Sequence, residues 1–150
     1  MATVKCPQWQ RQSMPRIVLI DDEPVLRITF SHVLRKQGYE VWVAEDGLKG
    51  VYLCRQVHPH LVITDILMPG QGGFTTIETI RKEFPATQVI AMTATEGSSC
   101  RELCRQLGAI CCVAKPVECA LLLRFVTNLL EGAALDEADN SAKYDSPHKV

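Results

Sequence analysis

The sequence predicts an α/β fold, with a doubly wound, five-stranded parallel sheet and helices on both of its faces. Short, uninterrupted apolar runs such as residues 17–20 and 61–64 are typical of parallel strands that are buried on both faces. Longer stretches, in which apolar residues recur at helical spacing, separate these runs. Because strands and helices alternate along the chain, we expect a parallel sheet that is covered on both sides.

Five strands and five helices are expected in alternation. The strands are expected at residues 17–20, 39–44, 61–64, 88–92 and 109–114. The helices are expected at residues 24–38, 47–57, 74–84, 98–107 and 117–131. Helix ends carry the usual signals: Pro24 suits a first turn, Ser98 can cap a helix, and Gly38, Pro85 and Gly108 can end one.

The helical spacing also predicts which side chains are buried. In the first helix the apolar side comprises Leu26, Phe30, Val33 and Leu34. In the second helix it comprises Leu48, Val51, Tyr52 and Val57. In the last helix Leu122, Val126 and Leu129 can face the sheet, which leaves a second apolar stripe formed by Leu121 and Phe125.

Length and composition are those of one globular domain. A chain of 150 residues, of which 47% are apolar, can bury the core of one domain and is hardly long enough for two domains. We expect a loose extension at residues 1–15, the domain at residues 16–131 and a disordered tail at residues 132–150. A net charge of −1 gives no general attraction to nucleic acid or to an anionic membrane. No signal peptide or membrane span is evident, so a cytoplasmic protein is expected, with its seven cysteines reduced.

Acidic residues follow two strands that this fold brings together. The strand order 2-1-3-4-5 has its switch point between the first and third strands, which lead into Asp21-Asp22 and Asp65. Three carboxylates would repel one another unless a cation lay between them, and hard oxygen ligands favour Mg²⁺, with Mn²⁺ as a second candidate. Thr93 and Lys115 follow the fourth and fifth strands at the same edge. This combination suits Mg²⁺-dependent phosphoryl transfer to Asp65.

Four motifs resemble one known family. The segments IVLIDDEP, LVITDILMPG, VIAMTA and VAKP occur in the order and spacing of the receiver domain of two-component response regulators, over about residues 16–131. The resemblance implies a flavodoxin-like fold similar to that of the chemotaxis regulators. It also implies that Asp65 is the phosphoacceptor and that Asp22 coordinates the metal directly. Asp21 would act through water, and the backbone carbonyl of Leu67 would complete the protein ligands.

The resemblance implies further roles. Thr93 matches the switch hydroxyl, Lys115 matches the phosphate-binding lysine, and the Lys115–Pro116 bond is expected to be cis. Such a chain signals instead of acting as an enzyme, and catalyses only its own phosphorylation and slow dephosphorylation. A histidine kinase or a histidine phosphotransfer protein is the expected phosphoryl donor. It would dock on the first helix and beside the site, at Val25, Ile28 and Pro116.

One departure from the family concerns the output. An aromatic switch residue usually lies three positions before the lysine, whereas this chain has Cys112. We expect a switch without a rotating ring, with output through the fourth helix, fifth strand and fifth helix. The residues proposed for this output are Cys112, Leu121 and Phe125. The surface could bind an unknown target protein or a second copy of the chain; a thiol switch or metal site built from the cysteines is less favoured, because zinc spacing is absent.

Several functions remain open. No output module is expected after Glu131, so the chain would be a stand-alone switch, a phosphorelay intermediate or a phosphate sink, without direct contact to nucleic acid. A pseudo-receiver that never cycles phosphate is the other alternative, and the intact acidic pair, Thr93 and Lys115 argue against it. A hydrolase of the haloacid-dehalogenase type would need an acidic residue at position 67, where this chain has Leu67, so this function is not favoured. Dinucleotide binding would need a G-x-G-x-x-G segment after the first strand, and the sequence lacks one there.

Overall fold

The centre of the fold is one sheet. The computed structural model describes residues 14–94, 98–132 and 144–145. Its strands are β1 (Arg16–Ile20), β2 (Glu40–Ala44), β3 (Leu61–Asp65), β4 (Gln88–Thr93), β5 (Cys111–Ala114) and β6 (Tyr144–Asp145). Its helices are α1 (Pro24–Lys36), α2 (Gly47–Val57), α3 (Gly73–Glu83), α4 (Ser98–Leu107) and α5 (Cys119–Glu131).

The sheet has the predicted parallel order. Its strands run β2-β1-β3-β4-β5-β6, and all pairs among the first five are parallel. Ile20 aligns with Thr64 across β1 and β3, and Asp65 aligns with Met92 across β3 and β4. The residues that follow β1, β3, β4 and β5 therefore meet at one edge of the sheet, as expected for parallel strands.

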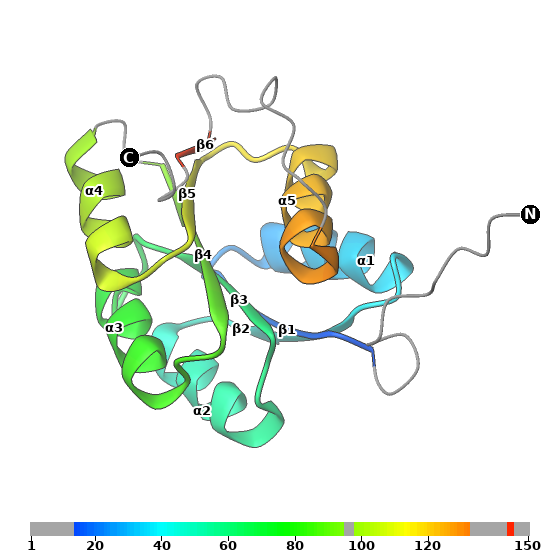
Figure 1. Cartoon of the computed structure of the whole chain (residues 1–150), viewed down its shortest axis with the longest axis horizontal. Coiled ribbons are helices and arrows are strands. Elements are labelled where there is room, and N and C mark those ends of the chain that lie inside the picture. Colours follow the sequence, from blue (N-terminus) through cyan, green and yellow to red (C-terminus); the bar gives the residue numbers. More distant parts are fainter. Residues whose placement is uncertain (1–13, 95–97, 133–143, 146–150) are drawn as a thin grey trace, which may run out of the picture.

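Helices cover both faces of the sheet. Helices α1 and α5 lie on one face, and α2, α3 and α4 lie on the other (Figure 1). Side chains of β1 alternate between the two cores: Ile17 and Leu19 pack with Phe30 of α1, whereas Val18 and Ile20 pack toward α2 and α3. None of the helices that the structure describes is long and apolar enough to cross a membrane.

The sixth strand lies within the tail that was expected to be disordered. Tyr144 aligns with Val113 and Asp145 with Cys112, in an antiparallel pairing at the outer edge of β5. The tail has no strand-like apolar pattern, so backbone pairing with a neighbouring edge could not be predicted from its composition. Residues 133–143 and 146–150, and residues 1–13 of the expected extension, lie outside the described residues.

The predicted apolar side of α2 is wrong at Leu48 and Tyr52, whereas Val51 is buried and Val57 packs against the core as predicted. Leu48 and Tyr52 are 68% and 60% exposed, whereas the buried residues of the helix are Gly47, Gly50, Val51 and Cys54. A Cβ atom at Gly50 would collide with the side chain of Ile20, so the helix backbone itself packs against the sheet. The hydrophobic pattern failed because it counts large apolar side chains and gives glycine no weight.

The predicted second stripe of α5 is wrong at Phe125. This side chain is 2% exposed and belongs to the same core as Leu122 and Val126, and Leu121 is half-buried against that core. Because α5 contacts α1 as well as lying over the sheet, its buried face is wider than one helical stripe (Figure 1). Phe125 therefore cannot line a docking surface.

Candidate functional site

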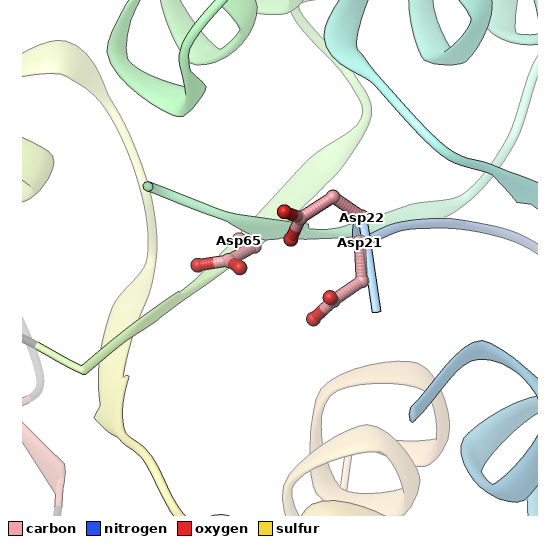
Figure 2. Close-up of side chains that lie close together, drawn as sticks. All are labelled: Asp21, Asp22 and Asp65. Carbon is pink, nitrogen blue, oxygen red and sulfur yellow. The ribbon is translucent and has the colours of Figure 1, made fainter. Parts of the chain in front are cut away.

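Three carboxylates converge at the edge where the parallel strands end. Asp21 follows β1 and is fully buried, Asp65 ends β3 and is 3% exposed, and Asp22 is half-buried. One oxygen atom of each side chain lies within 4.8 Å of the others (Figure 2). The cluster that the sequence predicted is therefore present, and its hard oxygen donors match what a divalent cation such as Mg²⁺ requires.

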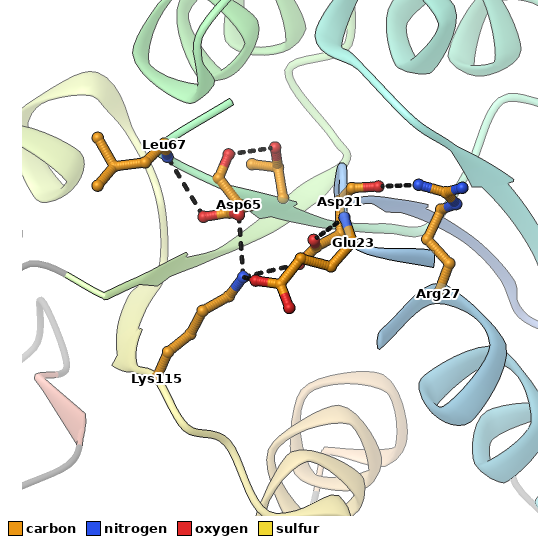
Figure 3. A network of polar contacts seen from close by, with 7 residues as sticks. Asp21, Glu23, Arg27, Asp65, Leu67 and Lys115 are labelled. Atoms are coloured by element: carbon orange, nitrogen blue, oxygen red, sulfur yellow. Dashed lines mark hydrogen bonds and ion pairs between the residues drawn. The ribbon is translucent and has the colours of Figure 1, made fainter. Parts of the chain in front are cut away.

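Lys115 joins these acids from the end of β5. Its Nζ atom is 2.9 Å from Asp21 Oδ2 and 2.9 Å from Asp65 Oδ2, and 3.5 Å from Glu23 Oε1 (Figure 3). The side chain of Lys115 is only 11% exposed. One ammonium group thus faces several carboxylates, so the site keeps a net negative charge and suits a cation.

Backbone groups fix the orientation of both buried aspartates. The amide of Glu23 donates a hydrogen bond to Asp21 Oδ1 at 2.9 Å, and the guanidinium side chain of Arg27 donates to the backbone carbonyl of Asp21 at 2.7 Å. The amide of Leu67 donates to Asp65 Oδ1 at 3.2 Å (Figure 3). Sequence reasoning missed the contacts of Glu23 and Arg27. Glu23 follows Asp21-Asp22 directly, and that third acid was the available signal.

Burial and the neighbouring charges shift the pKa values of Asp65 and Lys115 in opposite directions. Burial raises the pKa of Asp65, and its hydrogen bond and ion pair with Lys115 offset only part of this effect. For Lys115, burial lowers the pKa, but hydrogen bonds with Asp65 and Asp21 outweigh burial, so the pKa is raised. Lys115 therefore remains a fixed positive charge beside the Asp65 carboxylate.

A glycine allows α3 to begin directly against the end of β3. A Cβ atom at Gly73 would collide with the backbone oxygen of Asp65 and the Cα atom of Ile66. The Gly73 amide donates to the Ile66 carbonyl at 3.0 Å. The loop between them places Leu67, which is 57% exposed, at the mouth of the site. The close approach of α3 thus shapes the backbone that carries Asp65.

Thr93 lies at the end of β4, next to Lys115. It is 1% exposed, and its carbonyl accepts a hydrogen bond from the Lys115 amide at 2.7 Å. Its hydroxyl lies 3.7 Å from the Sγ atom of Cys100.

The Lys115–Pro116 bond is cis, which confirms the expectation from the sequence. Cys112, on β5, is 3% exposed.

The residues predicted to dock a partner are on the surface beside the site. Val25 and Ile28 of α1 are 72% and 69% exposed, and Pro116 is exposed. Ile28 borders a groove between α1 and β2 that Arg27 and Arg35 also line. A second groove lies between α1 and the segment that follows β5, and Lys115 and Pro116 contribute to it.

Comparison with known families defines the class of protein. The family model for the response regulator receiver domain matches residues 17–127. The chain therefore belongs to the response regulator receiver family of two-component systems. As a receiver domain it is a signalling switch and not an enzyme with a separate substrate.

Individual relatives agree with this assignment. The chain is 35% identical to Protein PilH of Pseudomonas aeruginosa over 121 residues, which are 79% of this chain and 100% of that protein. A CheY-like receiver structure from Methanospirillum hungatei superposes with a TM-score of 0.77 at 25% identity, covering 80% of this chain and 96% of that one. The BeF3-activated receiver domain of DrrB, a Thermotoga maritima response regulator, superposes with a TM-score of 0.73 at 26% identity, covering 79% and 98%.

Proposed function

We propose that the chain is a phosphorylatable switch that accepts a phosphoryl group on Asp65 in a Mg²⁺-dependent reaction. The observation that carries this proposal is the contact of Lys115 with Asp65 beside a cluster of three carboxylates. A buried aspartate needs such surroundings to approach an anionic phosphoryl donor, because its own charge would otherwise repel the donor.

Each residue of the site has a defined role in the proposed reaction. A carboxylate oxygen of Asp65 attacks the phosphorus atom of a phosphohistidine. The new O–P bond forms as the P–N bond breaks, and the imidazole leaves with the bonding electron pair. Lys115 neutralises charge on the phosphoryl oxygens, and the Thr93 hydroxyl donates a hydrogen bond to one of them.

The cation would be held by Asp21, Asp22, Asp65 and the backbone carbonyl of Leu67. When bound, Mg²⁺ supplies positive charge to the phosphoryl oxygens, which the single ammonium of Lys115 cannot balance alone. Support for this assignment comes from the spacing of the three carboxylates and from the preference of Mg²⁺ for oxygen ligands.

Acetyl phosphate, a small-molecule phosphoryl donor, tests the proposal directly. Incubation with acetyl phosphate and Mg²⁺ should add one phosphoryl group per chain, measured by intact mass, and a chelator should prevent it. Asp22→Ala should lose the labelling, because it removes a metal ligand. Glu78→Ala, which removes an exposed carboxylate on α3, is the matched control and should label normally. Labelling that continues at the same rate in the chelator would refute the Mg²⁺ requirement, and no labelling of the wild type would favour a pseudo-receiver.

We infer that a histidine kinase or histidine phosphotransfer protein docks on α1. Ile28 and Val25 are large apolar side chains exposed next to the site, and the groove beside Ile28 has a basic rim. Ile28→Asp should slow phosphoryl transfer from the cognate donor about tenfold or more while leaving labelling by acetyl phosphate unchanged.

Leu48→Asp is a close control for this surface. Leu48 is 68% exposed, against 69% for Ile28, but it lies on α2. Equal transfer rates for Ile28→Asp and the wild type would refute the docking site. Equal losses in the two variants would point to a general effect of the added charge.

A further inference from the structure

The outer edge of β5 is covered by a short strand from the chain's own tail. Tyr144 of β6 aligns with Val113 and Asp145 with Cys112, in an antiparallel pairing that extends the parallel sheet by one strand. Figure 1 shows β6 beside β5. Without β6, β5 would be the edge strand of the sheet, and its unpaired backbone groups would be open to a strand from elsewhere.

The strand β5 is held in place by the rest of the domain. Cys111 and Val113 are buried in the core that contains Phe125 of α5. Cys112 is buried in the core on the opposite face, which contains Cys104 of α4. On its inner side, all four residues of β5 align with β4. The outer edge of β5 is therefore preformed, and a strand that adds to it must order only itself.

The sequence of β5 contains nothing that discourages pairing with another chain. Residues 111–114 read Cys-Cys-Val-Ala, without a charge or a proline, and these are the features that usually protect edge strands. The strand β6 lies in the segment Lys-Tyr-Asp-Ser-Pro at residues 143–147, which contains two charged residues and a proline. Addition of β6 thus replaces an uncharged edge of four residues with a two-residue edge inside a charged segment.

The opposite edge of the sheet is protected in a different way. At β2, the guanidinium group of Arg35 donates a hydrogen bond to the backbone carbonyl of Val41 at 2.7 Å, so this acceptor is already engaged. Glu40, at the start of β2, adds an exposed charged residue. Both edges therefore carry a feature that hinders addition of a further strand, and at β5 that feature is β6.

We propose that β6 is an intramolecular cover that prevents a second copy of this chain from adding its own β5 to the sheet. Two β5 strands can pair antiparallel about a twofold axis, because each presents the same four residues to the other. An uncharged edge does not select a partner by charge, whereas a second copy matches it by symmetry. The inference concerns assembly, and it holds whether or not Asp65 accepts a phosphoryl group.

The cover and the second copy compete for the same backbone. A β5 strand from another chain would occupy the outer edge at Cys112 and Val113, where β6 is paired, so one excludes the other. Pairing of two residues is weak, but a strand in the same chain acts at an effective concentration on the order of millimolar. This tethering is the reason that β6 can exclude a longer strand from another copy.

Proline at both positions of β6 tests the proposal. Proline has no backbone N–H to contribute to a ladder, so Tyr144→Pro combined with Asp145→Pro should remove the pairing with β5. Sedimentation velocity over a concentration series should then show a dimer, with self-association at least about tenfold tighter than that of the wild type. Both substitutions lie outside residues 17–127, which the family model matches, so the domain is expected to fold.

Two control variants separate the loss of β6 from other effects. Tyr144→Phe combined with Asp145→Asn keeps both backbone amides but removes the charge, and Asn140→Pro combined with Ser141→Pro places two prolines outside β6. Both controls should associate no more tightly than the wild type. A dimer of the first control would show that charge, and not backbone pairing, keeps the copies apart. A dimer of the second would show a general effect of the tail, and either result would overturn the proposal.

Hydrogen exchange of peptides that contain residues 111–114 identifies the edge at which the copies meet. In dilute samples, the amides of β5 should exchange about fivefold faster in the double-proline variant of β6 than in the wild type, as expected for one lost hydrogen bond. At concentrations where this variant is dimeric, exchange should slow again, because a second β5 replaces β6. Peptides from β1 should exchange equally in both proteins and serve as the control for folding.

The two measurements together leave the proposal open to refutation. Faster exchange of β5 without a dimer would refute the second copy as the competitor, and a dimer that leaves β5 unprotected would place the interface elsewhere. Unchanged exchange and unchanged association in the double-proline variant, or a wild type that already dimerises through β5, would refute β6 as the cover.

Discussion

At the scale of single residues, the site is organised by one ammonium group among four acids. Lys115 contacts Asp21, Asp65 and Glu23, and Asp22 lies in the same cluster. The ammonium cannot compensate all of these charges, so without a cation the carboxylates repel one another. A site of this kind is expected to cost stability, because the repulsion among its carboxylates opposes folding.

Asp22→Ala should therefore stabilise the metal-free protein while it abolishes function. Removal of one carboxylate that lies within about 5 Å of two others should raise the free energy of unfolding in chelator by about 1 kcal/mol. Mg²⁺ should stabilise the wild type further and the variant little, since ligand binding to the native state adds to its stability. Thermal or denaturant unfolding with and without Mg²⁺ measures both effects.

Glu78→Ala is the reference for this prediction, because it removes an exposed carboxylate that has a lysine partner at i,i+4. Its stability should change by less than about 0.5 kcal/mol. Two results would contradict the electrostatic description of the site. The Asp22→Ala protein could be less stable than the wild type in chelator, or Mg²⁺ could stabilise the wild type and the Asp22→Ala protein equally.

The positions of some site residues could be predicted from the sequence, whereas some of their contacts could not. Asp21, Asp65 and Lys115 were predictable because each lies at the carboxyl end of a buried strand, or directly after it, and the strand's position is clear from its apolar run. The contacts of Glu23 and Cys100 were not predictable. They depend on how far a side chain reaches across the site and on the distance of α4 from β4, which no sequence spacing specifies.

At the scale of elements, glycine decides how helices approach the sheet. Gly50 brings the backbone of α2 against Ile20, and Gly73 brings the start of α3 against Asp65 and Ile66.

Helix boundaries were predicted well from proline and glycine signals, whereas the buried faces of α2 and α5 were not. The face of a helix is set by its neighbours on both sides, as the burial of Phe125 between the sheet and α1 shows.

Gly73→Ala should destabilise the protein and slow its labelling. The new methyl group would overlap the backbone of Asp65 and Ile66, and such overpacking costs roughly 1–3 kcal/mol. Because the displaced backbone carries Asp65, the proposed phosphoacceptor, the labelling rate with acetyl phosphate should fall as well. Denaturant unfolding and intact-mass kinetics on the same preparation measure the two effects.

Gly72→Ala is the neighbouring control. A Cβ atom there would lie 3.8 Å from the Ile66 carbonyl oxygen, in ordinary contact, and the residue has a φ of −70°. Alanine is a poorer N-cap than glycine, so a cost below about 1 kcal/mol and near-normal labelling are expected. Equal effects of the two substitutions would show that the close approach of α3 does not shape the site.

At the scale of the whole molecule, strand order creates the site. Asp21-Asp22 and Asp65 are more than 40 residues apart in the sequence, and they meet because β1 and β3 are adjacent and parallel. This architecture was predictable, since five alternating units with buried strands allow few arrangements. The pairing of β6 with β5 was not, because two residues carry no periodic signal.

The central claim is that Asp65 accepts the phosphoryl group, and intact mass after incubation with acetyl phosphate and Mg²⁺ tests it most directly. The wild type should gain one phosphoryl group, and Asp65→Asn should gain none, because the amide lacks the nucleophilic carboxylate oxygen. Asp46→Asn, at the N-cap of α2, should label like the wild type. A phosphoryl group on the Asp65→Asn protein, at the rate and extent of the wild type, would contradict the assignment.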